Sequence, residues 1–173
     1  MKIREFEKQI RQPLLQETLL FLIKDDEILL AMKKRGFGVG RFNGVGGKPN
    51  NKEGLLETAI RETKEEIGVE PLSFTKVADL KFYFPHKPLW HRHVHTYFCT
   101  AWSGKPLESE EMKPRWFKKN ELPFNRMWTD DSLWLPHALQ GKLVDGAFIF
   151  SENEQVLDYR IKFKTSGKNK TCS

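Results

Sequence analysis

The feature of this chain that most constrains its fold is the stretch from Gly47 to Val69, where a glycine-rich loop runs into a segment of helical periodicity. Pro49 interrupts the backbone pattern of the loop. Apolar and small residues then recur three and four positions apart, which places them on one helical face: Leu56, Ala59, Ile60, Thr63 and Ile67. Gly68 follows where a helix needs a left-handed stop. The stretch therefore predicts a loop and an amphipathic helix.

Three glutamates, Glu62, Glu65 and Glu66, cluster on another face of the predicted helix, close to Arg61. Like charges at this spacing repel, at a cost of roughly a few tenths of a kcal/mol per pair. A divalent cation among the carboxylates would remove that repulsion, and oxygen ligands suit Mg²⁺, with Mn²⁺ as a substitute. A solvated acidic face, with Arg61 paired to Glu57, is the alternative, and the glutamates by themselves favour it.

The spacing along the whole stretch favours the metal site instead. Five residues separate Gly47 from Glu53, and seven more separate Glu53 from the run Arg61–Val69. This pattern resembles the signature of the Nudix hydrolases, and it matches at every charged and glycine position. Thr63 departs from the signature, because the family usually has a bulky aliphatic residue there. Since Thr63 lies on the apolar face, the departure concerns packing more than chemistry.

Three further blocks narrow the resemblance to the animal-type MutT homologues within this family: 32–48, 108–117 and 122–134. The similarity extends from about Thr18 to about Phe163. It implies Mg²⁺-dependent hydrolysis of oxidised purine nucleoside triphosphates, of the 8-oxo-dGTP and 2-hydroxy-dATP type, to monophosphate and pyrophosphate. Such an activity clears damaged nucleotides from the precursor pool of DNA. The implied fold is an α/β/α sandwich with a mixed sheet.

The resemblance also implies which residues act on the phosphates. The expected metal ligands are Gly46, Glu62, Glu65, Glu66 and Glu111, and the expected catalytic residues are these four glutamates with Glu53 and Arg61. The backbone at Gly46 can approach a cation closely because no side chain intervenes. Glu111 lies outside the helix and would be a ligand or a base for the attacking water. By sequence alone, it is more simply a surface residue of an acidic loop.

A second set of residues would recognise the base. Trp128 is expected to stack on a purine, while Asn43, Asp130 and Asp131 hydrogen-bond its edge, so that a wrong base leaves them unpaired. The expected substrate-binding set is completed by Thr18, Lys33, Phe82 and Phe84. The alternatives are that Trp128 and the phenylalanines belong to the core, and that the two aspartates form the N-cap of a following helix.

The remaining pattern is richer in strands than in helices. Strands are predicted at 18–24, 28–32, 74–84, 94–102, 115–117, 146–151 and 156–163, and a second helix at 130–140. The first two and the last two strands form predicted hairpins, and 85–93 is a predicted long connection. This arrangement indicates an α+β or α/β sandwich. We expect one domain at 17–164, an N-terminal arm at 1–16 and a basic tail at 165–173.

Composition narrows the partners and the compartment. The formal net charge of +6 favours phosphate-bearing partners, but no long basic run indicates stable nucleic-acid binding. The family resemblance implies a small nucleoside triphosphate as the partner, and we expect a monomer. Cys99 and Cys172 give no disulfide framework, which suggests a reducing, cytoplasmic environment. The charged N-terminus shows no signal peptide, and the longest apolar run, 19–23, is too short to span a membrane.

The histidines near residue 90 are a second candidate for metal binding. His93 and His95 share one face of a predicted strand, and zinc suits such spacing. The sequence offers no evident cysteine or carboxylate to complete a zinc site, so we expect exposed strand histidines.

Two rival functions stay open at this point. The first is a Nudix hydrolase of another substrate, such as a nucleoside diphosphate sugar, a dinucleoside polyphosphate or a capped RNA end. The block containing Trp128, Asp130 and Asp131 argues against it. The second is a catalytically silent Nudix module that binds a nucleotide or a partner. The intact glutamate set argues against that reading, because a silent module has no need for converging carboxylates.

Overall fold

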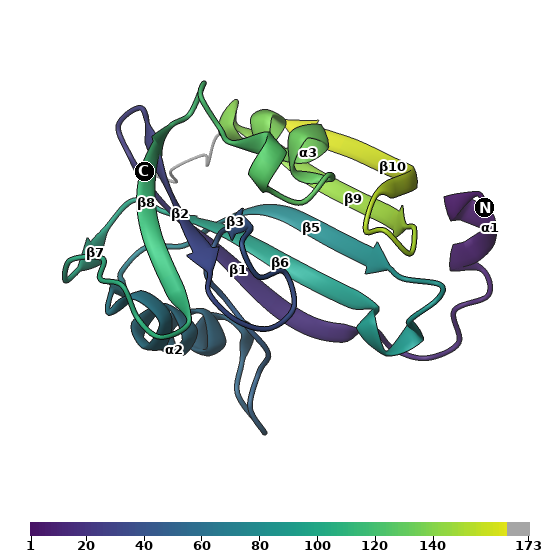
Figure 1. Ribbon diagram of the computed structural model, residues 1–173, viewed down its shortest axis with the longest axis horizontal. Helices are drawn as coiled ribbons and strands as arrows, with labels where there is room; N and C mark the ends of the chain where they lie inside the picture. Colours follow the sequence, from purple (N-terminus) through teal and green to yellow (C-terminus); the bar gives the residue numbers. More distant parts are fainter. Residues whose placement is uncertain (166–173) are drawn as a thin grey trace, which may run out of the picture.

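The computed structural model describes residues 1–165, and it builds one mixed eight-stranded sheet with helices on both faces (Figure 1). The strand order is β10-β9-β5-β6-β1-β2-β3, with β8 also paired to β2. The elements are α1 (Ile3–Glu7), β1 (Leu15–Lys24), β2 (Glu27–Lys33), β3 (Phe42–Asn43), α2 (Leu55–Ile67), β4 (Glu70–Pro71), β5 (Thr75–Tyr83), η1 (Pro88–Trp90), β6 (Arg92–Cys99), β7 (Trp102–Ser103), β8 (Met112–Lys118), η2 (Phe124–Arg126), α3 (Asp131–Leu139), β9 (Lys142–Phe150) and β10 (Val156–Thr165).

Side-chain alternation along β1 divides the core into two layers. Leu20 and Leu22 pack in one cluster with Ala59 of α2, whereas Phe21 packs with Trp134 of α3 in another. Successive residues of a strand point to opposite faces, so α2 and α3 cover opposite faces of the sheet. The pairs β1–β6 and β5–β9 are parallel and the other strand pairs are antiparallel. The predicted α/β/α sandwich with a mixed sheet is confirmed.

The helix α2 follows the predicted course with one exception. Gly68 ends it in the left-handed conformation, at φ 71°, and its N–H donates to the carbonyl of Lys64. Thr63 is fully buried, and its hydroxyl donates to the carbonyl of Ala59 at 2.6 Å, so the departure from the aliphatic residue leaves no unpaired polar group. The prediction that Leu56 lies on the buried face is wrong. Leu56 is 46% exposed, because it lies in the first turn, before the buried stripe begins at Thr58.

Both predicted hairpins are present, as β1–β2 and β9–β10. The predicted strand 94–102 instead ends at Cys99, and Trp102 belongs to the separate strand β7. The 85–93 connection contains the short helix η1, and β6 already begins at Arg92. These shifts are typical of element ends, which local patterns define poorly.

The predicted N-terminal arm contains α1 and the start of β1. Ile3 and Phe6 are buried against Tyr83, Ala147 and Ile149. The predicted basic tail, 165–173, lies outside the described residues except for Thr165, which ends β10. Within residues 1–165, no helix has the length and apolar character needed to cross a membrane.

Candidate active site

Close packing of the loop before α2 against β1 fixes the backbone beside the glutamates. A Cβ atom on Gly46 would lie 1.8 Å from the carbonyl oxygen of Thr18, and one on Gly47 would lie 2.4 Å from Glu62 Oε1. Gly46 therefore requires glycine for space, because backbone atoms block a side chain there, whereas at Gly47 the close atom is the end of a glutamate side chain. The N–H of Gly46 donates to Glu66 Oε2 at 3.2 Å. The loop backbone and the glutamate side chains thus meet at one point.

Arg61 hydrogen-bonds three carboxylates near Glu66, those of Glu53, Glu62 and Glu65. Its guanidinium donates two hydrogen bonds to Glu53, at 2.9 and 3.0 Å, and others to Glu62 at 2.8 Å and Glu65 at 3.2 Å. The hydroxyl of Thr58 donates to Glu53 at 2.7 Å. The hydrogen bonds from Arg61 have the largest effect, and together with the one from Thr58 they lower the pKa of the Glu53 carboxyl to about 2. Arg61 therefore pairs with Glu53 across the loop, where the alternative interpretation placed Glu57.

Glu66 is the deepest of the cluster, with 5% of its surface exposed. Burial raises the pKa of Glu66 to about 8, and the charges of Glu62 and Glu111 add to the shift. Burial also raises the pKa of Glu62, although Arg61 opposes it. A buried carboxylate surrounded by other carboxylates is stabilised by a proton or by a cation. These oxygen donors fit a hard divalent cation.

Glu111 occupies the loop before β8 and faces the cluster from outside the helix. Its side chain is half exposed and accepts a hydrogen bond from Arg35 at 2.9 Å, while its carbonyl accepts one from the N–H of Lys34. The structure therefore ties the loop after β2 to the loop before β8. Glu111 lies near enough to act on Glu62 and Glu66 electrostatically.

One cavity joins the glutamate cluster to the predicted base-recognition residues. All eight predicted substrate-binding residues line it, together with Gly46 and Glu66: Thr18, Lys33, Asn43, Phe82, Phe84, Trp128, Asp130 and Asp131. Glu53, Arg61, Glu62, Glu65 and Glu111 are not part of the lining. The structure thus brings Gly46 and Glu66 of the first predicted set into one cavity with the whole second set, while the individual roles of these residues stay predictions.

The two aspartates before α3 are both buried, each with 2% of its surface exposed. Asp130 accepts the indole N–H of Trp134 at 3.0 Å, and Asp131 accepts the backbone N–H of Trp128 at 3.2 Å. Neither caps α3, since no side-chain cap hydrogen bond is made and the helix begins at Asp131 itself. Burial raises the pKa of Asp130 to about 7 and that of Asp131 well above its ordinary value.

Sequence reasoning missed several aromatic and basic neighbours of Trp128. The guanidinium of Arg41 lies 4.1 Å from the centre of the Trp128 ring and pairs with Glu154 at 2.6 Å. Phe37 packs on Trp128 with ring centres 4.9 Å apart. Phe37 and Arg41 lie within the block 32–48, which carries the family resemblance. Their place in that block could have marked them as candidate site residues. Phe150 also lines the cavity, but only the pairing of β9 with β5 brings it there.

Phe42 and Trp90 were left without a role by the sequence. Phe42 is buried against Phe117, with ring centres 5.0 Å apart, and is absent from the cavity lining. Trp90 of η1 packs on Phe37 at 4.2 Å and on Phe84 at 6.0 Å, so it supports the aromatic side of the cavity from outside. The side chain of Lys87 covers its ring at 3.8 Å.

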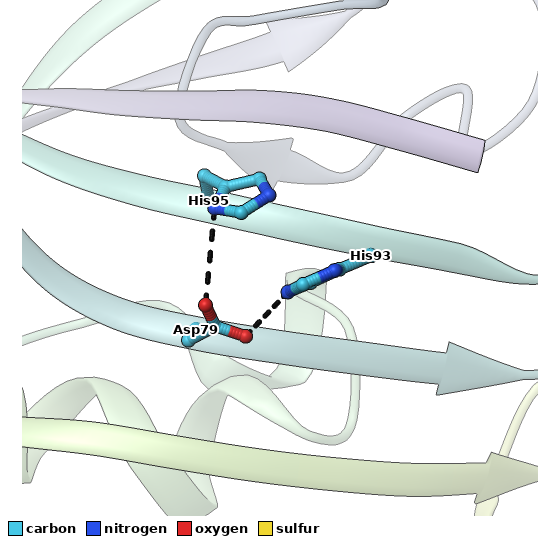
Figure 2. Close-up of side chains that lie close together, drawn as sticks. All are labelled: Asp79, His93 and His95. Atoms are coloured by element: carbon cyan, nitrogen blue, oxygen red, sulfur yellow. Dashed lines mark hydrogen bonds and ion pairs between the residues drawn. The ribbon is translucent and has the colours of Figure 1, made fainter. Parts of the chain in front are cut away.

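The expectation that no carboxylate accompanies His93 and His95 is wrong. Asp79 of β5 is paired with His95 across the sheet, and its carboxylate contacts both histidines (Figure 2). Short-range patterns could not reveal this group, because the contact depends on the register between β5 and β6.

Comparison with known proteins identifies the family. A model of the NUDIX domain matches residues 15–138. The chain is 40% identical over 145 residues to the oxidized purine nucleoside triphosphate hydrolase of Mus musculus, covering 84% of this chain and 92% of the relative. The protein of the same name from Danio rerio is 38% identical over 144 residues, with 83% and 92% covered. A crystal structure of a MutT protein from Bacillus halodurans matches with a TM-score of 0.75 and 26% identity, covering 86% of this chain and 98% of that one. The chain therefore belongs to the Nudix family.

Proposed function

We propose that this protein hydrolyses oxidised purine nucleoside triphosphates to the monophosphate and pyrophosphate. The observation that carries the proposal is the single cavity with Glu66 and Gly46 among its lining residues and Trp128, Asp130 and Asp131 among the others. A triphosphate attached to a purine needs both a cation site and a base site in such a cavity. The relatives at 40% and 38% identity bear the matching name.

Nudix hydrolases generally use divalent metals, and we propose Mg²⁺ as the cation here. Its ligands would be the backbone at Gly46 and the carboxylates of Glu62, Glu65, Glu66 and Glu111. When bound, Mg²⁺ neutralises phosphate oxygens and makes the phosphorus open to attack by water. Removal of the proton from Glu66, whose pKa is about 8 without a cation, would accompany binding.

The chain's own residues supply the positioning. Arg61, held by its two bonds to Glu53, fixes the carboxylates of Glu62 and Glu65 at one edge of the site. Glu111 stands on a separate loop, so it can serve as the base for the attacking water or as a further ligand. Lys33 lines the cavity and adds positive charge beside Glu66, close to where the sugar and phosphates would lie.

Base recognition would rest on stacking and on hydrogen bonds to one edge of the purine. The ring of Trp128 offers the stacking face. The side-chain oxygen of Asn43 accepts the N–H of Gly44 at 2.8 Å, which leaves the amide NH₂ to donate. Asp130 and Asp131 are both buried with raised pKa values, so a proton on either one makes that carboxyl a donor and leaves its neighbour an acceptor. The pair can then match a purine edge in two arrangements.

The test is turnover measured side by side with Mg²⁺ on 8-oxo-dGTP, 2-hydroxy-dATP, O6-methyl-dGTP, N6-methyl-dATP and the undamaged nucleotides. The expected result is higher kcat/KM for the oxidised purines. Faster turnover of a nucleoside diphosphate sugar, a dinucleoside polyphosphate or a capped RNA would favour the first rival function. Nucleotide binding without turnover would favour the silent module. We also propose that the active species is a monomer, which light scattering in the assay buffer tests.

A further inference from the structure

A second group of titratable side chains lies on the opposite face of the sheet from the cavity. Arg92 and Val94 of β6 line the cavity, so the alternation of the strand turns His93 and His95 to the other face. Asp79 lies beside them because β5 pairs with β6 with Asp79 opposite His95. Figure 2 shows the three side chains projecting from neighbouring strands toward one another. This cluster takes no part in the proposed hydrolysis.

The geometry of the cluster is compact. Its ligand atoms, one from each side chain, all lie within 4.8 Å of one another. Asp79 Oδ1 lies 2.5 Å from His93 Nε2, and Asp79 Oδ2 lies 3.8 Å from His95 Nδ1. The two imidazole rings are 4.3 Å apart between centres. Within residues 1–165, this is the one group of three possible metal-ligating side chains whose ligand atoms lie this close together.

A neighbouring side chain fixes the tautomer of His95. Gln16 Oε1 lies 2.6 Å from His95 Nε2, and an amide oxygen can only accept, so Nε2 carries the proton. Nδ1 then carries the lone pair, and it lies 2.8 Å from Lys76 Nζ and 3.8 Å from Asp79 Oδ2. Metal-binding histidines typically donate their other ring N–H to an oxygen in this way. The contact of Gln16 Nε2 with His93 Nδ1 is longer, at 3.4 Å, and constrains that ring less.

A cationic group already lies against two of these ligand atoms. Lys76 Nζ is 2.8 Å from His95 Nδ1 and 3.2 Å from Asp79 Oδ2. The side chain of Lys76 is 40% exposed, so it can move into solvent when another cation arrives. Burial first, then the charge of Lys76, lowers the pKa of His95 to about 4 and keeps its ring neutral at neutral pH. Burial raises the pKa of Asp79, but His93 and Lys76 outweigh that effect and lower it overall, so the carboxylate is ionised.

We propose that Asp79, His93 and His95 bind a divalent transition-metal ion of the zinc type, and that the ammonium of Lys76 takes its place when the ion is absent. Two imidazoles and one carboxylate suit Zn²⁺, with a fourth position left for water. The all-oxygen glutamate cluster suits Mg²⁺ instead. The two sites therefore differ in ligand chemistry and in the elements that carry them, since the glutamates lie mainly on α2 and the histidine cluster lies on β5 and β6. A bound ion would link β5 to β6 and, through Gln16, to β1.

The experiment is a calorimetric titration of the tag-free full chain with Zn²⁺, in buffer with excess Mg²⁺ to saturate the glutamate cluster. One tight Zn²⁺ site per chain is expected. Asp79→Asn and His93→Ala should each weaken binding by at least about a hundredfold, since loss of an outer-shell partner alone costs about 10- to 100-fold. Gln16→Ala should weaken it by about tenfold. Lys76→Met, which keeps length but removes charge, should tighten it.

Two controls make the result decisive. His86→Ala removes a histidine of the neighbouring connection and should leave Zn²⁺ affinity unchanged. Co²⁺ in place of Zn²⁺ should give the visible absorption of a tetrahedral nitrogen site, and Asp79→Asn should abolish it. Melting curves without metal verify that each variant is folded. Unchanged Zn²⁺ affinity in both Asp79→Asn and His93→Ala would overturn the metal site. Equal affinity in Lys76→Met and the parent chain would overturn the competition by the lysine.

Discussion

The carboxylates around Glu66 and those before α3 are held in different ways. At the phosphate end, arginines hold the outer carboxylates: Arg61 bonds to Glu62 and Glu65, and Arg35 to Glu111. At the base end, Asp130 and Asp131 accept N–H groups from tryptophans. No salt bridge in residues 1–165 includes either aspartate. On the proposed assignment, the phosphate end therefore takes a cation and the base end a proton.

The largest expected effect is at the phosphate end. Glu66→Gln keeps the shape of the side chain and its bond from Gly46 but removes a proposed ligand. Turnover with Mg²⁺ should fall by at least about a hundredfold, because even outer-shell changes cost about 10- to 100-fold. Without Mg²⁺ the melting temperature should stay equal or rise, since like-charge repulsion is relieved. Rates and melting curves with and without Mg²⁺ measure both.

The matched control for that variant is Glu57→Gln, which changes an exposed glutamate on the same helix. It should leave the rate and the effect of Mg²⁺ on melting unchanged. Near-parental turnover in Glu66→Gln would mean that Glu66 does not hold a catalytic cation. The proposed difference between the two ends would then be wrong.

Substitutions at the base end should change which substrate the enzyme prefers. Asp130→Asn and Asp131→Asn each fix one arrangement of donor and acceptor, so they should change the ratio of kcat/KM for 8-oxo-dGTP and 2-hydroxy-dATP in unequal ways. Unpaired buried groups cost about 1–3 kcal/mol, which predicts a change of about ten- to a hundredfold. The two substrates should also show different pH profiles in the parent enzyme. Equal losses of both activities with parallel profiles would place base choice elsewhere.

Trp128 allows a smaller test of the same end. Trp128→Ala should raise KM for purine triphosphates, because stacking contributes about 1–3 kcal/mol per base. Lys33→Ala should change base preference much less. Trp102→Ala is the control, since Trp102 is half-buried against Trp116 and does not line the cavity. An unchanged KM in Trp128→Ala would make this residue part of the aromatic core.

Most features that depend on short-range spacing in the sequence were predicted correctly. The glutamates and Gly68 lie within one loop and one helix, so periodicity and motif placed them correctly. Asp79 and Phe150 were missed because their neighbours come from strand pairing across the sheet. The prediction for Leu56 was wrong because a helical pattern does not reveal where the helix meets the sheet. The position of Asp130 and Asp131 in the cavity came from family resemblance, since composition favoured a helix cap.

The last expected effect concerns stability instead of turnover, and it tests the proton at the base end. Burial raises the pKa of Asp130 from the ordinary 3.8 to about 7. The folded state therefore binds this proton more tightly than the unfolded state does. That contribution is fully present below about pH 4 and is lost as the pH rises through 7. Glu53 acts in the opposite sense, but its window, from 4.5 down to about 2, lies below this range.

Asp130→Asn cannot ionise, so its melting temperature should fall less than that of the parent chain between pH 4 and pH 7. The difference between the two proteins should grow by up to about ten degrees over this interval, since a rise in pKa from 3.8 to about 7 corresponds to about 4 kcal/mol and about 1 kcal/mol to about 2–4 °C for a chain of this size. The control is Asp145→Asn, which alters an aspartate whose side chain is 55% exposed and should follow the parent curve. Both series are measured without Mg²⁺ and without nucleotide, so that neither ligand stabilises the fold. A constant difference between parent and Asp130→Asn across the interval would mean that Asp130 is ionised in the folded protein, and the base end would then need a cation as the phosphate end does.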